Sequence, residues 1–122
     1  DGVILSTPVG SSGYSVSAGG PLLYPGMNAV ALTPICPFLN TISPMVFPGA
    51  TVFRMRIEPG STDCYITVDG QEGQQLEFGD LVEVTGVPAA VRFMGDEISF
   101  FERLRTRGFV LECPSGVDAG KV

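Results

Sequence analysis

Short apolar runs, separated by turns, alternate along most of this 122-residue chain. The 16 Gly and 10 Pro that punctuate them are typical of an all-β domain with many turns. The first run, at residues 2–6, predicts a buried strand, and residues 7–11 predict a turn. Residues 12–18 predict a short helix, which the glycines and proline at 19–21 end.

Strict alternation of apolar and polar side chains predicts two more strands. Over residues 51–58, the apolar side chains of Phe53, Met55 and Ile57 fall on one face. Residues 63–70 alternate in the same way. The size of the chain is that of one domain.

The rest of the chain has weaker patterns. Residues 99–107 break the alternation and predict a short helix, because Phe100, Phe101 and Leu104 lie at near-helical spacing. Residues after Phe109 predict a tail. The remaining expected elements are a strand at 29–35 interrupted by Pro34, an extended irregular stretch at 37–48, two short runs at 76–78 and 81–84 around a Gly79-Asp80 turn, and a strand at 90–94.

Composition suggests a surface that is partly covered. Charged residues make up 16% of the chain and hydrophobic residues 44%, whereas about 25% charged is ordinary. Large apolar patches usually mark interfaces, so we expect the chain to self-associate or to contact another domain. The net charge of −6 argues against a nucleic-acid partner. No run has the length of a membrane span.

Several kinds of chemistry are excluded by residue type. The chain has no histidine, which rules out Ser-His-Asp and Cys-His catalysis and His-ligated metals within it. Cys36, Cys64 and Cys113 match no zinc or disulfide pattern. They favour a reducing, cytoplasmic setting. The carboxylates of Asp80, Asp96 and Glu97 are interpreted as solvated, and no metal site is expected.

The strand, turn and helix at residues 2–18 are the main candidate site. The glycines at 10 and 13 let the backbone approach a ligand, and free N–H groups at the helix start would favour an anion or polar group. Six hydroxyl side chains add donors and acceptors. The pattern alone nevertheless favours an ordinary Ser- and Gly-rich turn. As an isolated residue, Tyr14 is also compatible with an ordinary core position.

Longer motifs favour a ligand site over an ordinary turn. Residues 1–21 resemble a segment of NAD kinases that reads Asp-Gly, a few apolar residues, Thr-Pro-Thr-Gly-Ser-Thr-Ala-Tyr, and then Ser-Ala-Gly-Gly-Pro. Three further family motifs follow in order: Thr-Pro-Ile-Cys-Pro at 33–37, Val-Asp-Gly-Gln at 68–71 and Phe-Phe-x-x-Leu-Arg at 100–105. The resemblance therefore extends over nearly the whole chain.

The resemblance implies a fold and a division of the protein. It implies the mainly β, β-sandwich-like C-terminal domain of an NAD kinase, with one or two short helices, over residues 1–109. Residues 110–122 would be a C-terminal tail. The N-terminal, ATP-binding domain would lie outside this chain.

The resemblance also implies roles for single residues. Asp1 would reach the nicotinamide side of NAD, often across a subunit boundary, and Ser12 and Tyr14 would contact the ribose and adenine regions. The full implied NAD-binding set is Asp1, Ser12, Gly13, Tyr14 and Ser17. Possible neighbours of the site are Thr7, Gly10, Ser11, Asp69, Gly70 and Gln71. No catalytic residue and no metal ligand is implied in this chain.

Five positions depart from the family pattern. Val9, Ser12 and Gly13 replace the usual Thr or Ser, Thr and Ala, while Phe38 stands where His is frequent and Ser43 where Arg precedes Pro. Ser12 keeps a hydroxyl and Val9 loses one. The departures bear on substrate preference and assembly.

The implied activity is phosphorylation of the adenosine 2′-hydroxyl of NAD to give NADP, with ATP or polyphosphate and a divalent metal such as Mg²⁺. The family's Gly-Gly-Asp-Gly motif and its Asn-Glu/Asp pair are absent from the sequence, so the isolated chain is expected to be inactive. Its implied partners are NAD, its own N-terminal domain and further copies of itself. Two alternatives stay open: a related diacylglycerol- or lipid-kinase-superfamily domain, and a non-catalytic β-sandwich binding or assembly module.

Overall fold

The structure is a computed structural model that describes residues 1–40, 42–60, 63–92 and 99–109. The chain divides into two compact units, residues 1–90 and residues 91–122. Strands dominate the first unit, and the described part of the second unit contains one helix. The expected mainly β fold with short helices is therefore confirmed. No helix among the described residues combines the length and apolar character needed to cross a membrane.

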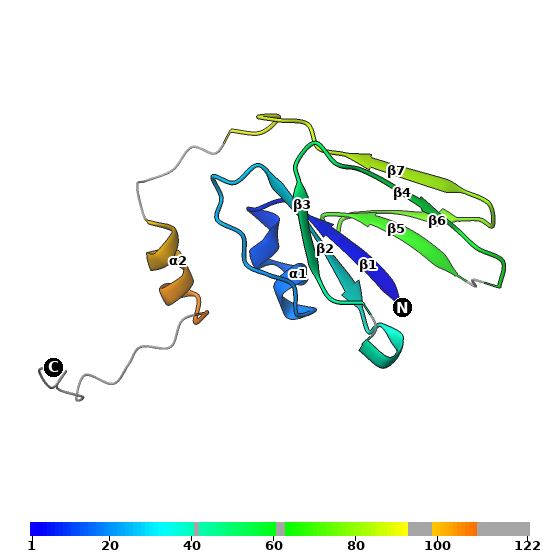
Figure 1. Ribbon diagram of the computed structural model, residues 1–122, viewed down its shortest axis with the longest axis horizontal. Coiled ribbons are helices and arrows are strands. Elements are labelled where there is room, and N and C mark those ends of the chain that lie inside the picture. Colours follow the sequence, from blue (N-terminus) through cyan, green and yellow to red (C-terminus); the bar gives the residue numbers. More distant parts are fainter. Residues whose placement is uncertain (41, 61–62, 93–98, 110–122) are drawn as a thin grey trace, which may run out of the picture. The chain divides into compact units, whose positions relative to one another are not determined.

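Three antiparallel strands form the first sheet, in the order β1-β2-β3. They are β1 (Gly2–Ser6), β2 (Ala29–Ile35) and β3 (Met45–Pro48). The segment that joins β1 to β2 contains a 3-10 turn, η1 (Gly10–Ser12), and a one-turn helix, α1 (Tyr14–Ser17). Figure 1 shows this segment in blue beside β1 and β2.

The strand β2 continues through Pro34, so the expected interruption there is wrong. The Ile35 carbonyl accepts a hydrogen bond from the Asp1 amino group on the β1 side, at 3.0 Å. Because backbone groups alternate sides along a strand, the nitrogen of Pro34 faces the β3 side instead. Pairing with β3 stops at Leu32, so Pro34 lies at an edge, where a missing N–H costs no ladder hydrogen bond.

The stretch at 37–48 was expected to be irregular throughout, but its last four residues form a strand. β3 occupies Met45–Pro48, and a short 3-10 segment, η2 (Phe38–Asn40), precedes it. Proline is tolerated at a strand terminus and at a sheet edge, and both conditions hold for Pro48. The strand forms because β2 offers a partner, which the local sequence does not reveal.

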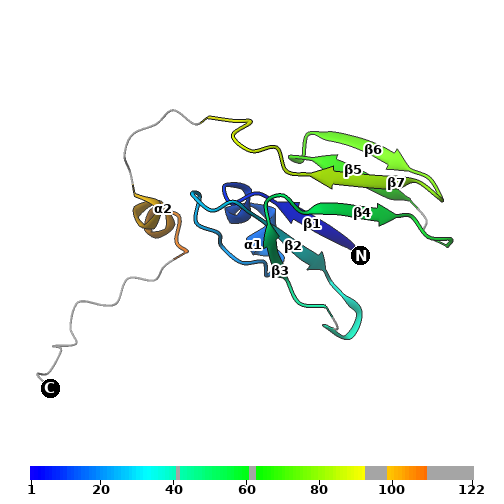
Figure 2. The ribbon, with the colours of Figure 1, turned by 45° about the horizontal axis from the view of Figure 1, so that its top comes forward.

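Two antiparallel ladders of two strands each follow. Along the chain, both strands of the inner ladder lie between the two strands of the outer ladder. The outer ladder pairs β4 (Val52–Arg56) with β7 (Leu81–Thr85). Along β4, Phe53 and Met55 are half-buried and the other three residues are exposed, as the alternation predicts. Figure 2 shows this ladder over the first sheet, where the rings of Phe47 and Phe53 meet edge to face with centroids 5.3 Å apart.

The inner ladder pairs β5 (Cys64–Val68) with β6 (Glu72–Leu76). The predicted run at 76–78 is therefore misplaced, because β6 ends at Leu76. Four of the five residues of β6 are exposed, so no apolar alternation marks this strand in the sequence. The turn before it sets its pairing instead.

That turn, Val68 to Gln71, is a type I′ turn. Asp69 and Gly70 both have positive φ, 51° and 69°, and the Gln71 N–H donates to the Val68 carbonyl at 3.1 Å. Asp-Gly is a preferred pair for such turns, because glycine adopts positive φ without steric cost. This pair therefore forms the tight turn between β5 and β6. Another lies before β7, where the Asp80 carboxylate accepts from the Glu77 N–H at 2.8 Å.

The buried residues of the first unit are concentrated near its start. Among its described residues, all that are buried lie between positions 6 and 33. Only three are hydrophobic, Leu23, Ala29 and Ala31. The others are Ser6, Ser11, Ser15 and Thr33. The interior of this unit is therefore unusually rich in hydroxyl groups.

The described part of the second unit contains the helix α2 (Phe100–Thr106), which confirms the predicted helix. It begins with a capping box, in which the Ser99 hydroxyl accepts from the Glu102 N–H and the Glu102 carboxylate accepts from the Ser99 N–H, both at 3.2 Å. Of the predicted strand at 90–94, residues 90–92 form no strand and the other two lie outside the described residues. The predicted tail at 110–122 also lies outside them.

Candidate functional site

The segment from Thr7 to Ser17 is tied together mainly by its own backbone. The Gly10 N–H donates to the Thr7 hydroxyl at 3.2 Å, and the Ser11 N–H donates to the Thr7 carbonyl at 2.9 Å. The Gly13 N–H donates to the Gly10 carbonyl at 3.0 Å. Of these three amides, only that of Gly13 lies within the predicted helix, and for Gly13 the expectation of a free N–H group is wrong.

Ser11 anchors the segment to the chain that enters β2. Its side chain is 1% exposed, and its hydroxyl donates to the Pro8 carbonyl at 2.7 Å while accepting from the Leu23 N–H at 3.0 Å. Both hydrogen-bonding roles of the hydroxyl are thus filled inside the protein. Ser11 lies beneath the predicted site and supports it.

The helix α1 has an inner and an outer face. Ser15 points inward, is 1% exposed, and lies 2.9 Å from the hydroxyl of Thr33 on β2. Tyr14 is 66% exposed and Ser17 is also exposed. Residues three apart share a helix face, so Tyr14 and Ser17 lie together on the outer side. An ordinary core position for Tyr14 is excluded.

A close backbone approach holds α1 in this orientation. A Cβ atom on Gly20 would lie 2.3 Å from the Thr33 hydroxyl and 2.4 Å from the Ser15 hydroxyl. The Gly20 N–H also donates to the Ser15 carbonyl at 2.8 Å. The inward face of β2 is built from Ala29, Ala31 and Thr33, and such small side chains leave room for close packing. The sequence presents Ser15 only as one of six hydroxyl donors and acceptors, and Gly20 only as part of the helix stop, so this packing against Thr33 was not predicted.

Two more predicted residues complete the exposed surface. Ser12 is half-buried, and its hydroxyl donates to the Val9 carbonyl at 3.3 Å. Gly13 is exposed. A Cβ atom on Gly13 would lie 3.3 Å from the Gly10 carbonyl oxygen, so a larger residue at this bend between η1 and α1 would be packed tightly. The predicted residues from 7 to 17 are therefore brought together.

The other predicted residues lie toward opposite ends of β1. Asp1 directly precedes β1, and the six residue steps from Asp1 to Thr7 along an extended strand span roughly 20 Å, so Asp1 lies far from Thr7 on the same chain. The Asp69-Gly70 turn lies at the end of the ladders where β1 finishes, as both ribbon views show (Figures 1 and 2). Asp69, Gly70 and Gln71 are all exposed.

The candidate surface carries no charged side chain. No Asp, Glu, Lys or Arg occurs between Gly2 and Phe53, and the exposed groups are hydroxyls, backbone, the side chain of Val9 and the ring of Tyr14. Such a surface suits a sugar or a base, which hydrogen-bonds and stacks, better than it suits a bare phosphate. Within the described ranges, no three Cys, Asp or Glu side chains come together in a way that could hold a metal ion.

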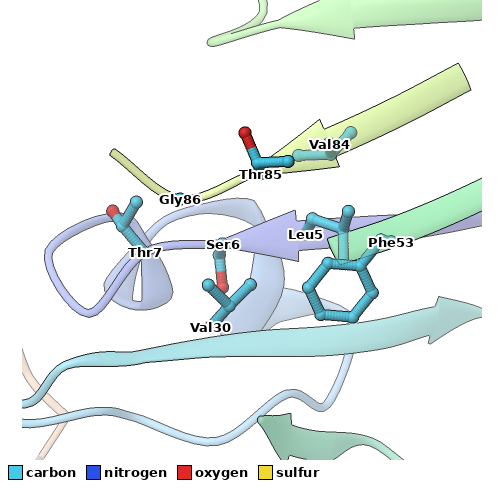
Figure 3. Close-up of a pocket in the computed structure, with 8 residues that line it drawn as sticks. All are labelled: Leu5, Ser6, Thr7, Val30, Phe53, Val84, Thr85 and Gly86. Carbon is cyan, nitrogen blue, oxygen red and sulfur yellow. The ribbon is translucent and has the colours of Figure 1, made fainter. Parts of the chain in front are cut away.

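A small hollow lies behind the end of β1 (Figure 3). Its volume is about 100 Å³, well below the several hundred Å³ usual for a ligand pocket. The Ser6 hydroxyl beside it is buried and has no hydrogen-bond partner. The apolar side chains around it make it a packing gap between the first sheet and the outer ladder. It is lined by Leu5, Ser6, Thr7, Val30, Phe53, Val84, Thr85 and Gly86.

Comparison with known proteins identifies relatives of this chain. Residues 1–95 match the family described as the ATP-NAD kinase C-terminal domain. The chain is 52% identical over 111 residues to an NAD kinase of Oleidesulfovibrio alaskensis, covering 90% of this chain and 38% of that protein. It is 40% identical over 108 residues to an NAD kinase of Geobacter sulfurreducens, covering 88% of this chain and 38% of that protein.

One solved structure provides a comparison in three dimensions. The chain resembles the crystal structure of yeast NADH kinase complexed with NADH, with a TM-score of 0.64 and 39% sequence identity. The match covers 70% of this chain and 24% of that one. The chain thus spans little more than a third of the length of the bacterial relatives cited above and about a quarter of the yeast protein.

Proposed function

This chain belongs to the family of ATP-NAD kinase C-terminal domains, and on that premise we propose that the intact protein is an NAD kinase. It would transfer a phosphoryl group from ATP or polyphosphate to the 2′-hydroxyl of the adenosine ribose of NAD, giving NADP. The family match over residues 1–95 is the observation that carries this proposal. The relatives named NAD kinase support it.

In this proposal the present chain supplies much of the NAD site. The exposed ring of Tyr14 and the exposed hydroxyl of Ser17 share the outer face of α1, and Ser12 and Gly13 adjoin them. Thr7 and Gly10 hold the preceding turn, and Asp69, Gly70 and Gln71 would flank the site. The absence of charge between residues 2 and 53 favours contact with the ribose and adenine rather than with the phosphates.

The phosphate donor would bind elsewhere in the protein. Phosphoryl transfer requires a base, a metal and a phosphate cradle. The described residues bring no three metal-ligating side chains together, so they do not fit the divalent ion, and no step of the reaction is assigned to it here. We assign the donor site to an N-terminal domain, with residues 1–109 as the NAD-binding domain and 110–122 as a tail.

Assembly into a homo-oligomer is part of the proposal. Asp1 lies far from the other predicted NAD contacts along β1, which favours its acting at the site of a neighbouring subunit. The exposed side chains of Val52, Tyr65 and Leu81, with exposed fractions of 46%, 59% and 55%, supply apolar surface for contacts with that subunit or with the N-terminal domain. The thiols of Cys36 and Cys64 are free, in keeping with a cytoplasmic setting.

NADH is a second candidate substrate, favoured by the likeness to a yeast NADH kinase complexed with NADH. The reduced and oxidised nicotinamides differ far from the adenosine 2′-hydroxyl that would be phosphorylated. A surface that contacts ribose and adenine would therefore distinguish them weakly. The choice would depend on residues near the nicotinamide, among which Asp1 is the candidate in this chain.

The experiment is a kinase assay on the intact protein. NADP or NADPH is measured after incubation with ATP or polyphosphate, Mg²⁺ and either NAD or NADH, and a lipid alcohol tests the wider superfamily. We expect phosphorylation of the dinucleotide by the intact protein and none by the 122-residue chain alone. Failure of the intact protein to form NADP or NADPH with either donor refutes the proposed activity.

Assembly is tested separately on the same preparation. Size-exclusion chromatography with light scattering at micromolar concentration gives the mass of the intact protein. We expect a homo-oligomer with a two-fold contact, the commonest symmetry, which should bury more than about 1,000 Å². A monomeric mass with full activity would show that Asp1 is not needed across a subunit boundary.

A further inference from the structure

The hydroxyls of Ser15 and Thr33 form an isolated polar contact inside the first unit. Their oxygens lie 2.9 Å apart, and the two residues are 1% and 0% exposed. Ser15 lies on α1, in the segment that joins β1 to β2. Thr33 lies on β2, opposite Ile4 of β1 in the strand register. The contact therefore fastens the candidate NAD-binding segment directly to the sheet.

The helix α1 depends on such a contact for its orientation. It has only four residues, and an isolated helix of that length is not stable in water. Its rotation about its own axis must therefore be set by contacts with the rest of the protein. Ser15 lies between Tyr14 and Ser17, so a rotation that moved Ser15 away from Thr33 would turn the exposed face of α1 as well.

A hydrogen bond between two buried hydroxyls constrains that rotation more than an apolar contact would. A bond has a preferred distance and direction, whereas apolar contact is non-directional. Gly20 closes over the pair so tightly that even a Cβ atom would lie 2.3 Å from the Thr33 hydroxyl. Water cannot therefore replace either partner without movement of the backbone.

We propose that Thr33 and Ser15 are positioning residues, whose hydroxyl contact sets the orientation of α1 and thereby of its Tyr14 and Ser17 face toward NAD. This inference rests on the proposed function. Neither residue touches the substrate in this scheme. Their effect reaches NAD through α1, so it should appear in NAD binding and not in use of the phosphate donor.

The test compares three variants of the intact protein. Thr33→Val removes the hydroxyl from a side chain of similar shape, and Thr33→Ser retains it. The double variant Ser15→Ala/Thr33→Val removes both hydroxyls, so no buried hydroxyl is left unpaired and folding is preserved. We expect the KM for NAD to rise about tenfold in Thr33→Val and in the double variant, as for one lost hydrogen bond. Thr33→Ser should stay within about twofold of the wild type, and the KM for ATP should not change in any of them.

A control separates positioning from general loss of stability. Met55 is half-buried on β4, outside the β1–α1–β2 region, and Met55→Ala should lower the melting temperature without raising the KM for NAD. A double variant with a wild-type KM for NAD overturns the inference, as does an equal rise in Met55→Ala. An inactive wild-type protein would instead refute the proposed function, so the two failures are distinguishable.

Discussion

Between residues 6 and 33 the interior of the first unit is made largely of hydroxyl groups, whereas the strands between residues 45 and 85 contain no fully buried residue, and among them β4, β5 and β7 alternate apolar and polar side chains. Charge is divided in the same way. Apart from Asp1, every charged residue lies at Arg54 or beyond. One region is uncharged and closely packed, and the other is charged and more open.

The difference shows two ways of holding backbone in place. In the first region, Ser11, Ser15 and Thr33 form specific hydrogen bonds that only small side chains permit, and these bonds hold a loop that has little regular structure. In the second region, the ladders hold themselves by backbone pairing and leave large apolar side chains exposed. Substitutions matched between the two regions test this distinction.

Gly20→Ala should have the largest effect on stability. The new Cβ atom would meet two hydroxyl oxygens at 2.3 and 2.4 Å and the Ser15 carbonyl at 2.8 Å, and overpacking of this kind costs about 3 kcal/mol. Gly73→Ala on β6 is the control, because its Cβ atom would meet nothing closer than 3.6 Å. Chemical denaturation of the intact protein measures both. Equal losses in the two variants would show that the first region is not more closely packed.

Ser11→Ala should have the next largest effect. It leaves the Leu23 N–H and the Pro8 carbonyl without their shared partner, which costs about 2 kcal/mol for buried groups. Ser6→Ala is the matched control, since the Ser6 hydroxyl is buried without a partner. That change should leave the free energy of unfolding unchanged or raise it. A Ser6→Ala variant as unstable as Ser11→Ala would mean that the Ser6 hydroxyl has a partner in solution.

Tyr14→Ala should weaken NAD binding in the intact protein. A ring that stacks on a base contributes about 1–3 kcal/mol, so the dissociation constant should rise about tenfold. Tyr65→Ala is the control in the second region, because Tyr65 is 59% exposed against 66% for Tyr14. Isothermal titration calorimetry gives both constants. An unchanged affinity in Tyr14→Ala rules out the proposed contact.

The ion pair between Arg54 and Glu83 should contribute least. The two side chains meet at 2.7 Å across β4 and β7, but they are 66% and 48% exposed. Exposed pairs are worth about 0.5 kcal/mol, because solvent and salt screen them. A double-mutant cycle with Arg54→Ala and Glu83→Ala measures the coupling energy. A coupling above about 1 kcal/mol would show that this surface is covered in the intact protein.

The strands with a regular apolar pattern could be predicted from the sequence, and those without one could not. β4 and β5 are visible from alternation, and β1 from its apolar run. β6 reads Glu-Gly-Gln-Gln-Leu and is exposed on nearly all its length, so no local pattern marks it. β3 lies between prolines and exists because β2 offers it a partner.

The candidate site could be located from its motif, but its internal organisation could not. The Thr-Pro-x-Gly-Ser run at 7–11 and Tyr14 mark the segment. Which of its hydroxyls face solvent and which are buried depends on tertiary contacts. Ser11 and Ser12 are neighbours of the same type, yet Ser11 is buried and bonded to Leu23, while Ser12 is half-buried.

The sequence by itself determined the family, the mainly β class and the turns, because motifs, alternation and pairs such as Asp69-Gly70 depend on residues that are close along the chain. Only the tertiary structure decided that Ser15 meets Thr33, 18 residues away, beneath Gly20. A hydroxyl is suited equally to solvent, to a ligand and to a buried bond. Its role follows from what the fold places within hydrogen-bonding distance.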